Sequence, residues 1–154
     1  MLPTGILDRS GVSVANTASS KKRILEQAAR LLARDAEEPT TEQIFERLLE
    51  RERLGSTGLA GGVALPHARM PGIDDSRGAF MRLTDPVEFD ALDGRPVDLV
   101  FALLVPEDAT DEHLQLLAKL AATFNDDEIR QRLRDADAEQ ALKILNGTST
   151  PHAA

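Results

Sequence analysis

Two histidines and a pair of arginines are the residues of this chain most suited to chemistry. His67 directly follows Pro66, and proline fixes φ and removes a backbone donor, so Pro66 ends the preceding apolar run and sets the direction of His67. An imidazole with an ordinary pKa of about 6.5 is largely neutral, and hence nucleophilic, near neutral pH. Taken alone, His67 is either such a nucleophile or a surface residue at the end of a strand.

His113 is the second candidate, because it stands in the first turn of an expected helix. Backbone N–H groups point outward there, and the helix dipole favours negative charge. Asp111 and Glu112 are ordinary first-turn residues, so His113 gains a role only if the fold brings it to His67. The chain has three histidines, with His152 near its end, and no cysteine. It lacks the close histidine spacing typical of zinc sites, so no metal is expected.

Arg51 and Arg53 end a predicted helix just before a glycine-rich loop, residues 55–62. A guanidinium can bind a phosphoryl group through two N–H donors, although solvated arginines are also common at helix C-termini. The loop is neither a P-loop, which needs lysine after its last glycine, nor a dinucleotide fingerprint, which follows a strand. It either supplies turns of positive φ or lets backbone N–H groups approach an anion beside His67.

Composition limits the class of protein that these residues can serve. A length of 154 residues suits one domain with a hydrophobic core. A net charge of −8 argues against a nucleic-acid partner and is compatible with a basic protein partner. The longest apolar runs, such as the one that contains residues 100–105, are too short to span a membrane. With no secretory signal and no cysteine, a cytoplasmic location is expected.

The residue pattern predicts two helices before the glycine-rich loop. Ser19 or Ser20 can cap the first, whose apolar stripe contains Ile24, Ala28, Leu31 and Leu32. Thr40 and Gln43 form a capping box that opens the second helix, and Gly55 ends it. These two helices are expected to pack as a hairpin.

The rest of the chain predicts short strands followed by helices. Strands are expected at 6–7, 12–14, 63–65, 78–83 and 97–105, and a short one at 87–89 between turn signals at Asp85-Pro86 and 92–94. Thr110 or Asp111 caps a helix that reaches Phe124, and further helices cover 126–134 and 138–145. Residues 1–147 are expected to form one α/β domain, followed by a flexible tail at 148–154.

Several of these stretches together resemble the enzyme IIA family of the phosphoenolpyruvate–sugar phosphotransferase system, of the mannitol/fructose type. The resemblance lies in Arg51-Glu52-Arg53-Leu54-Gly55-Ser56-Thr57-Gly58, in Gly62-Val63-Ala64-Leu65-Pro66-His67, and in residues 97–106 and 113–117. The resemblance covers about residues 19–146, and within the family it is strongest to the nitrogen-related regulatory branch. It implies a single three-layer α/β domain, in which helices flank both sides of a short mixed sheet.

The resemblance also implies roles for individual residues. The family's phosphorylated histidine follows proline and corresponds to His67, its second pocket histidine to His113, and its pocket arginine to Arg51. The loop beside them is expected to bind the phosphoryl group through Gly55, Ser56, Thr57 and Gly58. Two positions depart from or add to the pattern: Ala68 stands where many members have glycine, and Arg69 adds a positive charge of unassigned function.

The resemblance implies a phosphocarrier that needs no cofactor. His67 would attack the phosphoryl group held by a histidine of a carrier that resembles HPr or its nitrogen-branch form. The added charge, about −1.5 to −2, would then change binding to regulatory targets such as potassium-transport or sensor proteins. The alternatives are a sugar-transport enzyme IIA that passes phosphate to a IIB domain, and a non-enzymatic module whose histidines sense pH or hold a metal.

Overall fold

One strand of ten residues with almost no polar side chains organises the fold. β5 (Val97–Pro106) is buried at eight of its ten positions, so it needs cover on both faces. β4 (Arg77–Val87) pairs with it antiparallel, and β1 (Val12–Asn16) extends the sheet parallel to β4. On the other side of β5, β2 (Val63–Ala64) and β3 (His67–Met70) pair with it in parallel. This computed structural model describes residues 2, 5–34, 36–109 and 111–147.

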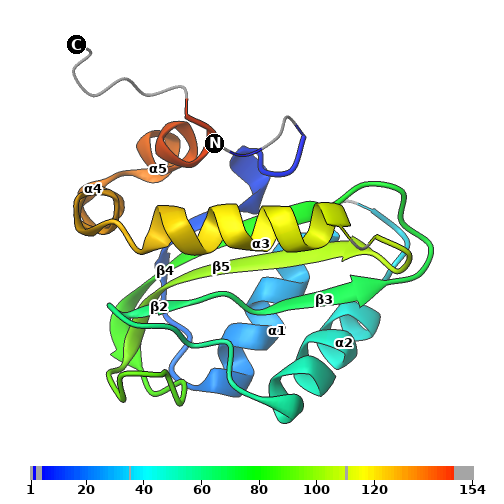
Figure 1. Cartoon of the computed structure of the whole chain (residues 1–154), viewed down its shortest axis with the longest axis horizontal. Helices are drawn as coiled ribbons and strands as arrows, with labels where there is room; N and C mark the ends of the chain where they lie inside the picture. Colours follow the sequence, from blue (N-terminus) through cyan, green and yellow to red (C-terminus); the bar gives the residue numbers. More distant parts are fainter. Residues whose placement is uncertain (1, 3–4, 35, 110, 148–154) are drawn as a thin grey trace.

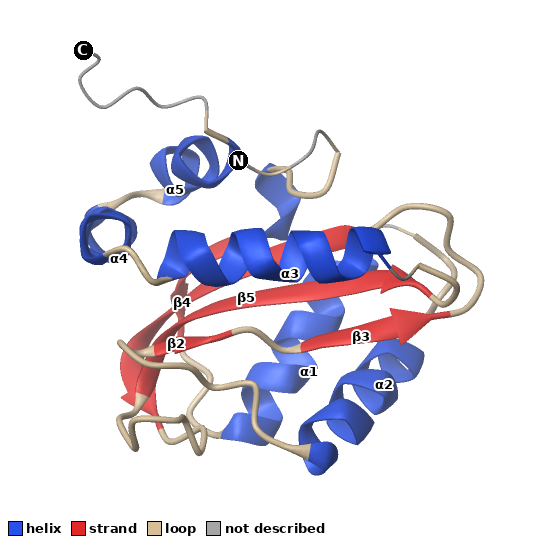
Figure 2. Ribbon diagram, viewed as in Figure 1, coloured by secondary structure: helices blue, strands red, loops and turns tan. Residues whose placement is uncertain are grey.

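Helices form a layer on each face of this mixed sheet (Figures 1 and 2). α1 (Lys21–Ala33) and α2 (Thr41–Leu54) cover one face, where their apolar sides enclose Ala64, Ala68 and Met70. α3 (Asp111–Phe124), α4 (Asp127–Asp135) and α5 (Ala138–Asn146) cover the other, over Phe80 and Phe101. The predicted three-layer α/β architecture is therefore confirmed.

The predicted starts and ends of the helices follow from local capping. Ser20 accepts a hydrogen bond from the N–H of Arg23 and begins α1, and the predicted capping box of Thr40 and Gln43 begins α2. Gly55 ends α2, and Gly147 in the left-handed conformation ends α5. Asp126 and Asp137 accept from the first N–H groups of α4 and α5. Of the two caps expected for α3, Thr110 lies outside the described residues, as do His152 and the expected tail, residues 148–154.

Three predicted strand boundaries are wrong, and long-range pairing explains each. Residues 6–7 form no strand: the carbonyl of Ile6 accepts one backbone hydrogen bond, from the N–H of Gly78, and a 3₁₀ turn (Arg9–Gly11) precedes β1. β4 continues through Asp85-Pro86 to Val87, because its pairing with β5 is irregular between Arg82 and Val87 and can tolerate a missing donor. No separate strand therefore covers 87–89.

The third difference concerns the chain on either side of Pro66. Val63 pairs with Leu99 and His67 with Leu103, so β2 and β3 keep the same separation from β5 of 36 positions (99 − 63 and 103 − 67). Pro66 therefore interrupts one edge strand without shifting its register, and its carbonyl still accepts from the N–H of Leu103 at 2.9 Å. His67 begins a new length of strand and is not the end of the previous one.

Candidate functional site

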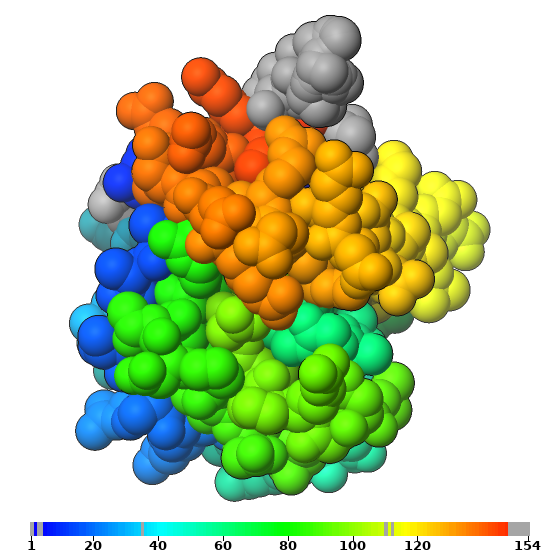
Figure 3. All heavy atoms as spheres, turned by 90° about the vertical axis from the view of Figure 1, so that its left-hand side faces the viewer, coloured from blue at the N-terminus to red at the C-terminus, as the bar shows by residue number. Residues whose placement is uncertain are grey.

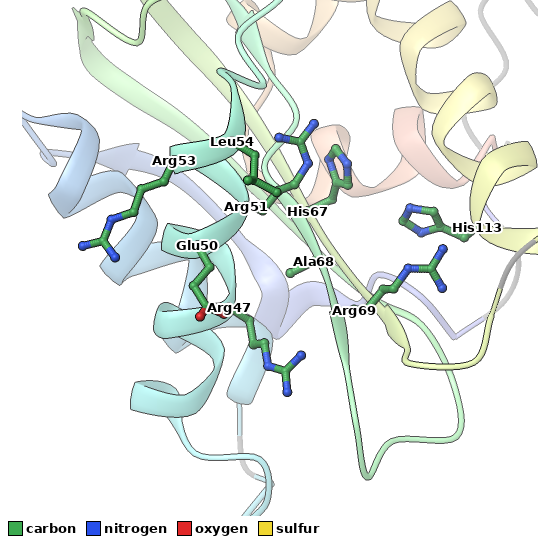
Figure 4. Close-up of a pocket in the computed structure, with 9 residues that line it drawn as sticks. All are labelled: Arg47, Glu50, Arg51, Arg53, Leu54, His67, Ala68, Arg69 and His113. Carbon is green, nitrogen blue, oxygen red and sulfur yellow. The ribbon is translucent and has the colours of Figure 1, made fainter.

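A cavity of about 580 Å³ opens between the end of α2, the start of β3 and the first turn of α3 (Figure 4). It brings together the three predicted site residues His67, His113 and Arg51. The two imidazole ring centres are 5.7 Å apart, with 50° between the ring planes. The remaining described residues of the wall are Arg47, Glu50, Arg53, Leu54, Ala68 and Arg69. The wall is thus cationic, with four arginines, although the chain carries a net charge of −8.

His67 is held in one tautomer by the backbone just before it. Its Nδ1 lies 2.8 Å from the carbonyl oxygen of Leu65, which can only accept, so Nδ1 carries the proton and donates it. The lone pair of the neutral ring is therefore on Nε2. Burial lowers the pKa of His67 below its usual value, and the nearby charge of Arg51 lowers it further. The ring is consequently neutral, with a free Nε2, at neutral pH.

His113 is nearly enclosed, at 8% exposure, in the first turn of α3. Burial lowers the pKa of His113, and the facing His67 and Arg69 act in the same direction. Within the described part of the chain, its Nδ1 is buried and has no hydrogen-bond partner. Unpaired buried N–H groups are rarer than unpaired acceptors, which favours a bare Nδ1 and a proton on Nε2.

The arginines of the cavity are held differently. Arg51 donates to the carbonyl of Gly55 at 2.9 Å, a bond that caps the end of its own helix, and its guanidinium lies beside His67 in Figure 4. The side chain of Arg53 points away from both histidines. Of the two arginines considered together in the sequence, Arg51 is therefore the one that faces the imidazoles.

Arg69 is a residue of the site whose function the sequence left unassigned. Alternate residues of a strand share a face, so Arg69 lies on the same side of β3 as His67. Its guanidinium donates to the carbonyls of Glu107 (3.1 Å) and Ala109, and so braces the segment that leads into α3 and His113. The spacing of two residues between His67 and Arg69 indicates a shared strand face only when a strand is known to start at His67.

Ala68, the departure from the family pattern, fits the strand without strain. Its side chain is buried in the core on the α1 and α2 side, and it is not among the described non-glycine residues with positive φ. Glycine is therefore not needed at this position for the backbone path of β3.

The glycine-rich loop differs from the expected phosphoryl cradle. The N–H of Gly55 donates to the carbonyl of Glu52, and the N–H of Thr57 donates to the Glu52 carboxylate. The N–H of Gly58 donates to the hydroxyl of Ser56, and that hydroxyl donates to the carbonyl of Phe89. Among the described residues, the cavity wall includes none of Gly55, Ser56, Thr57 and Gly58. The geometry of the free protein therefore does not support their predicted role in binding substrate.

Three of the four glycines of the loop, Gly58, Gly61 and Gly62, instead meet steric demands. Gly62 has φ of +81°, and a Cβ there would lie 2.6 Å from the guanidinium of Arg134 and 2.9 Å from the carboxylate of Asp98. Arg134 binds that carboxylate at 2.8 Å and also donates to the carbonyl of Gly61. The blue-green loop consequently lies directly below the orange α4 in Figure 3.

Glu52 is a buried carboxylate for which the sequence alone indicates no function. It forms an ion pair with Lys21 at 3.0 Å and accepts hydrogen bonds from the N–H and hydroxyl of Thr57. In the sequence, Lys21, Glu52 and Thr57 each look like an ordinary polar residue near a helix end. Nothing local connects them, because Lys21 meets Glu52 only when α1 packs against α2.

The described residues offer neither a metal site nor a membrane span. Within the described ranges, no group of three or more His, Asp or Glu side chains could hold a metal ion. No described helix is long and apolar enough to cross a membrane.

Comparison with known proteins places these features in a family. Residues 5–147 match the family described as "Phosphoenolpyruvate-dependent sugar phosphotransferase system, EIIA 2". A nitrogen regulatory protein of Pseudomonas aeruginosa is 51% identical over 133 residues, which are 86% of each chain. The crystal structure of the nitrogen regulatory protein IIA-Ntr from Neisseria meningitidis is 48% identical with a TM-score of 0.86, covering 91% of this chain and 96% of that one. IIA mannitol from Escherichia coli shares the fold alone, at 20% identity, a TM-score of 0.75 and coverage of 90% and 98%.

Proposed function

Because this chain belongs to the EIIA 2 family of the phosphoenolpyruvate-dependent sugar phosphotransferase system, we propose that it is a phosphocarrier of the nitrogen-related branch, phosphorylated on Nε2 of His67. One observation carries the proposal. The bond from Nδ1 to the carbonyl of Leu65 fixes the proton on that nitrogen, which leaves Nε2 as the nucleophile in a cationic cavity. The sequences of nitrogen regulatory relatives support the branch.

The transfer exchanges one nitrogen–phosphorus bond for another. The lone pair of Nε2 attacks the phosphorus, the bond between phosphorus and the carrier's imidazole breaks, and that imidazole leaves with the electron pair. The His67 ring then carries both the phosphoryl group and its Nδ1–H, and hence a positive charge. The carbonyl of Leu65 accepts that N–H throughout, so it stabilises the charge without taking the proton.

Charge on the phosphoryl oxygens is met by groups fixed before the substrate arrives. In the loose transition state of phosphoryl transfer, positioning and electrostatic stabilisation supply most of the catalysis. Arg51 offers its guanidinium beside His67, and His113 offers an Nε2–H donor from the first turn of α3. Neutral histidines suit this division of roles, because a protonated His67 could not attack.

The partner class follows from the same chemistry. The donor is a small carrier of the HPr type, or its nitrogen-branch form, that presents a phosphohistidine to the cationic cavity mouth. The phosphoryl group gives this mouth about −1.5 to −2 additional charge, which can switch binding of regulatory protein targets without a change of fold.

Transfer from phosphoenolpyruvate tests the proposal. The protein is incubated with labelled phosphoenolpyruvate, enzyme I and the carrier, and acid-labile label is measured on each chain. The wild type is expected to become labelled and His67→Ala to remain unlabelled. A labelled carrier beside an unlabelled wild-type protein would reject the phosphocarrier function. Onward transfer to a fructose-type IIB domain as fast as from the carrier would instead favour sugar transport.

A further inference from the structure

Glu52 is a buried ionisable group that the transfer step does not use directly. Its side chain is 3% exposed, in the last turn of α2 between Arg51 and Arg53. Within the described chain it is absent from the cavity wall, so it does not meet the substrate. Burying an ionised carboxylate is strongly unfavourable unless it is paired and hydrogen-bonded, so its partners indicate its function.

The contacts of Glu52 and Lys21 join three segments of the chain: the start of α1, the end of α2 with the loop that follows it, and residues 89–90. Lys21, the first residue of α1, pairs with it at 3.0 Å and also reaches Asp90 at 3.4 Å. The ammonium group of Lys21 lies 4.8 Å from the ring centre of Phe89. The N–H of Thr57 donates to the Glu52 carboxylate at 3.1 Å, and its hydroxyl donates to the same group. Both hydrogen-bond donors of Thr57, its N–H and its hydroxyl, are thus held by the carboxylate of Glu52.

A continuous path of hydrogen bonds leads from this carboxylate to the nucleophile. The carbonyl of Thr57 accepts the N–H of Leu65 at 3.0 Å. The carbonyl of Leu65, in turn, accepts Nδ1–H of His67 at 2.8 Å. Glu52 therefore fixes Thr57, Thr57 fixes Leu65, and Leu65 sets both the tautomer and the direction of the imidazole.

We propose that Glu52 is a positioning residue for phosphoryl transfer: it orients His67 through Thr57 and Leu65, and its charge stabilises the positive charge that the ring gains on phosphorylation. The proposal rests on the phosphocarrier function proposed above. It also gives the predicted Gly-Ser-Thr-Gly loop a different role, which is to transmit the position of Glu52 to His67. Oriented hydrogen bonds in a low-dielectric interior strengthen one another, which suits such a chain.

Glu52→Gln removes the charge and keeps the shape, and Glu46→Gln on the exposed face of α2 is the matched control. The first readout is the pKa of His67, followed by NMR in the unphosphorylated protein. The negative charge of Glu52 raises that pKa, so Glu52→Gln is expected to lower it and the control to leave it unchanged. If Glu52 only stabilised the fold, its replacement would leave the pKa of His67 unchanged.

The second readout is the rate of His67 phosphorylation at saturating carrier. Misplaced nucleophiles lose rate steeply, so we expect Glu52→Gln to lower the maximal rate about tenfold, with the KM for the carrier within about twofold. Thermal melting establishes that the variant is folded. Unchanged pKa and rate in a folded variant would overturn the proposal, and so would a slower rate with an unchanged pKa.

Thr57→Val keeps the test decisive if Glu52→Gln does not fold. This variant loses the hydroxyl donor but retains the carboxylate, so it should slow transfer by a smaller factor at a nearly unchanged His67 pKa. A wild-type rate in Thr57→Val would then overturn the proposal. If the wild type accepts no phosphate at all, the phosphocarrier function fails, whereas the NMR titration still tests the link between Glu52 and His67.

Discussion

The cavity and the buried cluster beneath it use polar groups in opposite ways. In the cluster of Lys21, Glu52 and Thr57, each charge or donor meets a partner inside the protein. In the cavity, the bond from Nδ1 of His67 to the carbonyl of Leu65 leaves the lone pair of the ring on Nε2, which no other group is needed to hold in place. Satisfied polar groups fix positions, whereas unsatisfied ones are available to a substrate. Under the proposed function, the first group of residues positions the site and the second reacts in it.

Apart from the loss of His67 itself, the largest expected effect comes from removing the cation beside it. Arg51→Met should lower the maximal rate of phosphorylation about 100-fold, because one preorganised charge on the transferring group is lost. It should also raise the pKa of His67, since the charge of Arg51 lowers it. Stopped-flow transfer from the phosphorylated carrier measures the rate. Arg53→Met, whose side chain points away, should change it by less than about threefold; equal effects of the two substitutions would contradict the assignment.

His113 should separate activity from stability. His113→Phe removes the N–H donor and should slow transfer about tenfold, in line with the loss of one hydrogen bond to a charged group. Stability should not fall, because the substitution also removes a buried nitrogen that lacks a partner. Urea unfolding and transfer kinetics on the same preparation check both parts. A destabilised protein with wild-type transfer would show that His113 is structural.

Thr57 belongs to the satisfied cluster, so stability should report its loss. Thr57→Val removes a hydrogen bond to a buried carboxylate and should lower the free energy of unfolding by about 1 kcal/mol or slightly more. Equilibrium urea unfolding gives this value. A variant as stable as the wild type would mean that the Glu52–Thr57 bond contributes nothing to the fold.

The smallest effect is on the pH dependence of stability. Both histidine pKa values are lowered in the folded protein, so the unfolded chain binds protons first as the pH falls. The stability that the neutral rings contribute is complete above about pH 6.5 and decreases as the pH falls from there toward the folded pKa values. The urea midpoint of unfolding, measured at several values from about pH 7.5 down to about pH 5.5, gives the slope of stability against pH. Replacing both histidines should flatten it, and an unchanged slope would assign the effect to other groups.

The same contrast explains what the sequence could predict. Capping residues and apolar periodicity are local, so Ser20, Thr40 and Gly55 located the helix ends correctly. Strand limits depend on a partner strand, which is why the residue pattern ends a strand at Pro66 and predicts another strand at residues 6–7. Pro66 removes one donor but does not by itself show whether pairing resumes.

The same distinction between local and long-range information applies to the candidate site. His67, His113 and Arg51 were identified from linked motifs that resemble a family, and the fold brings all three to one cavity. Arg69 donates to the carbonyl of Glu107 and Glu52 pairs with the ammonium of Lys21, and only the tertiary structure brings these partners together. Glycines of the loop suggest an anion cradle, but backbone angles or close neighbours account for Gly58, Gly61 and Gly62 without a ligand.

The position of the phosphoryl group tests the central claim most directly. NMR of the phosphorylated protein with ¹⁵N-labelled histidine identifies the phosphorylated nitrogen through its coupling to phosphorus. The predicted result is a phosphoryl group on Nε2 of His67, with Nδ1 still protonated toward the carbonyl of Leu65. Phosphorylation on Nδ1 of His67, or on His113, would contradict the account.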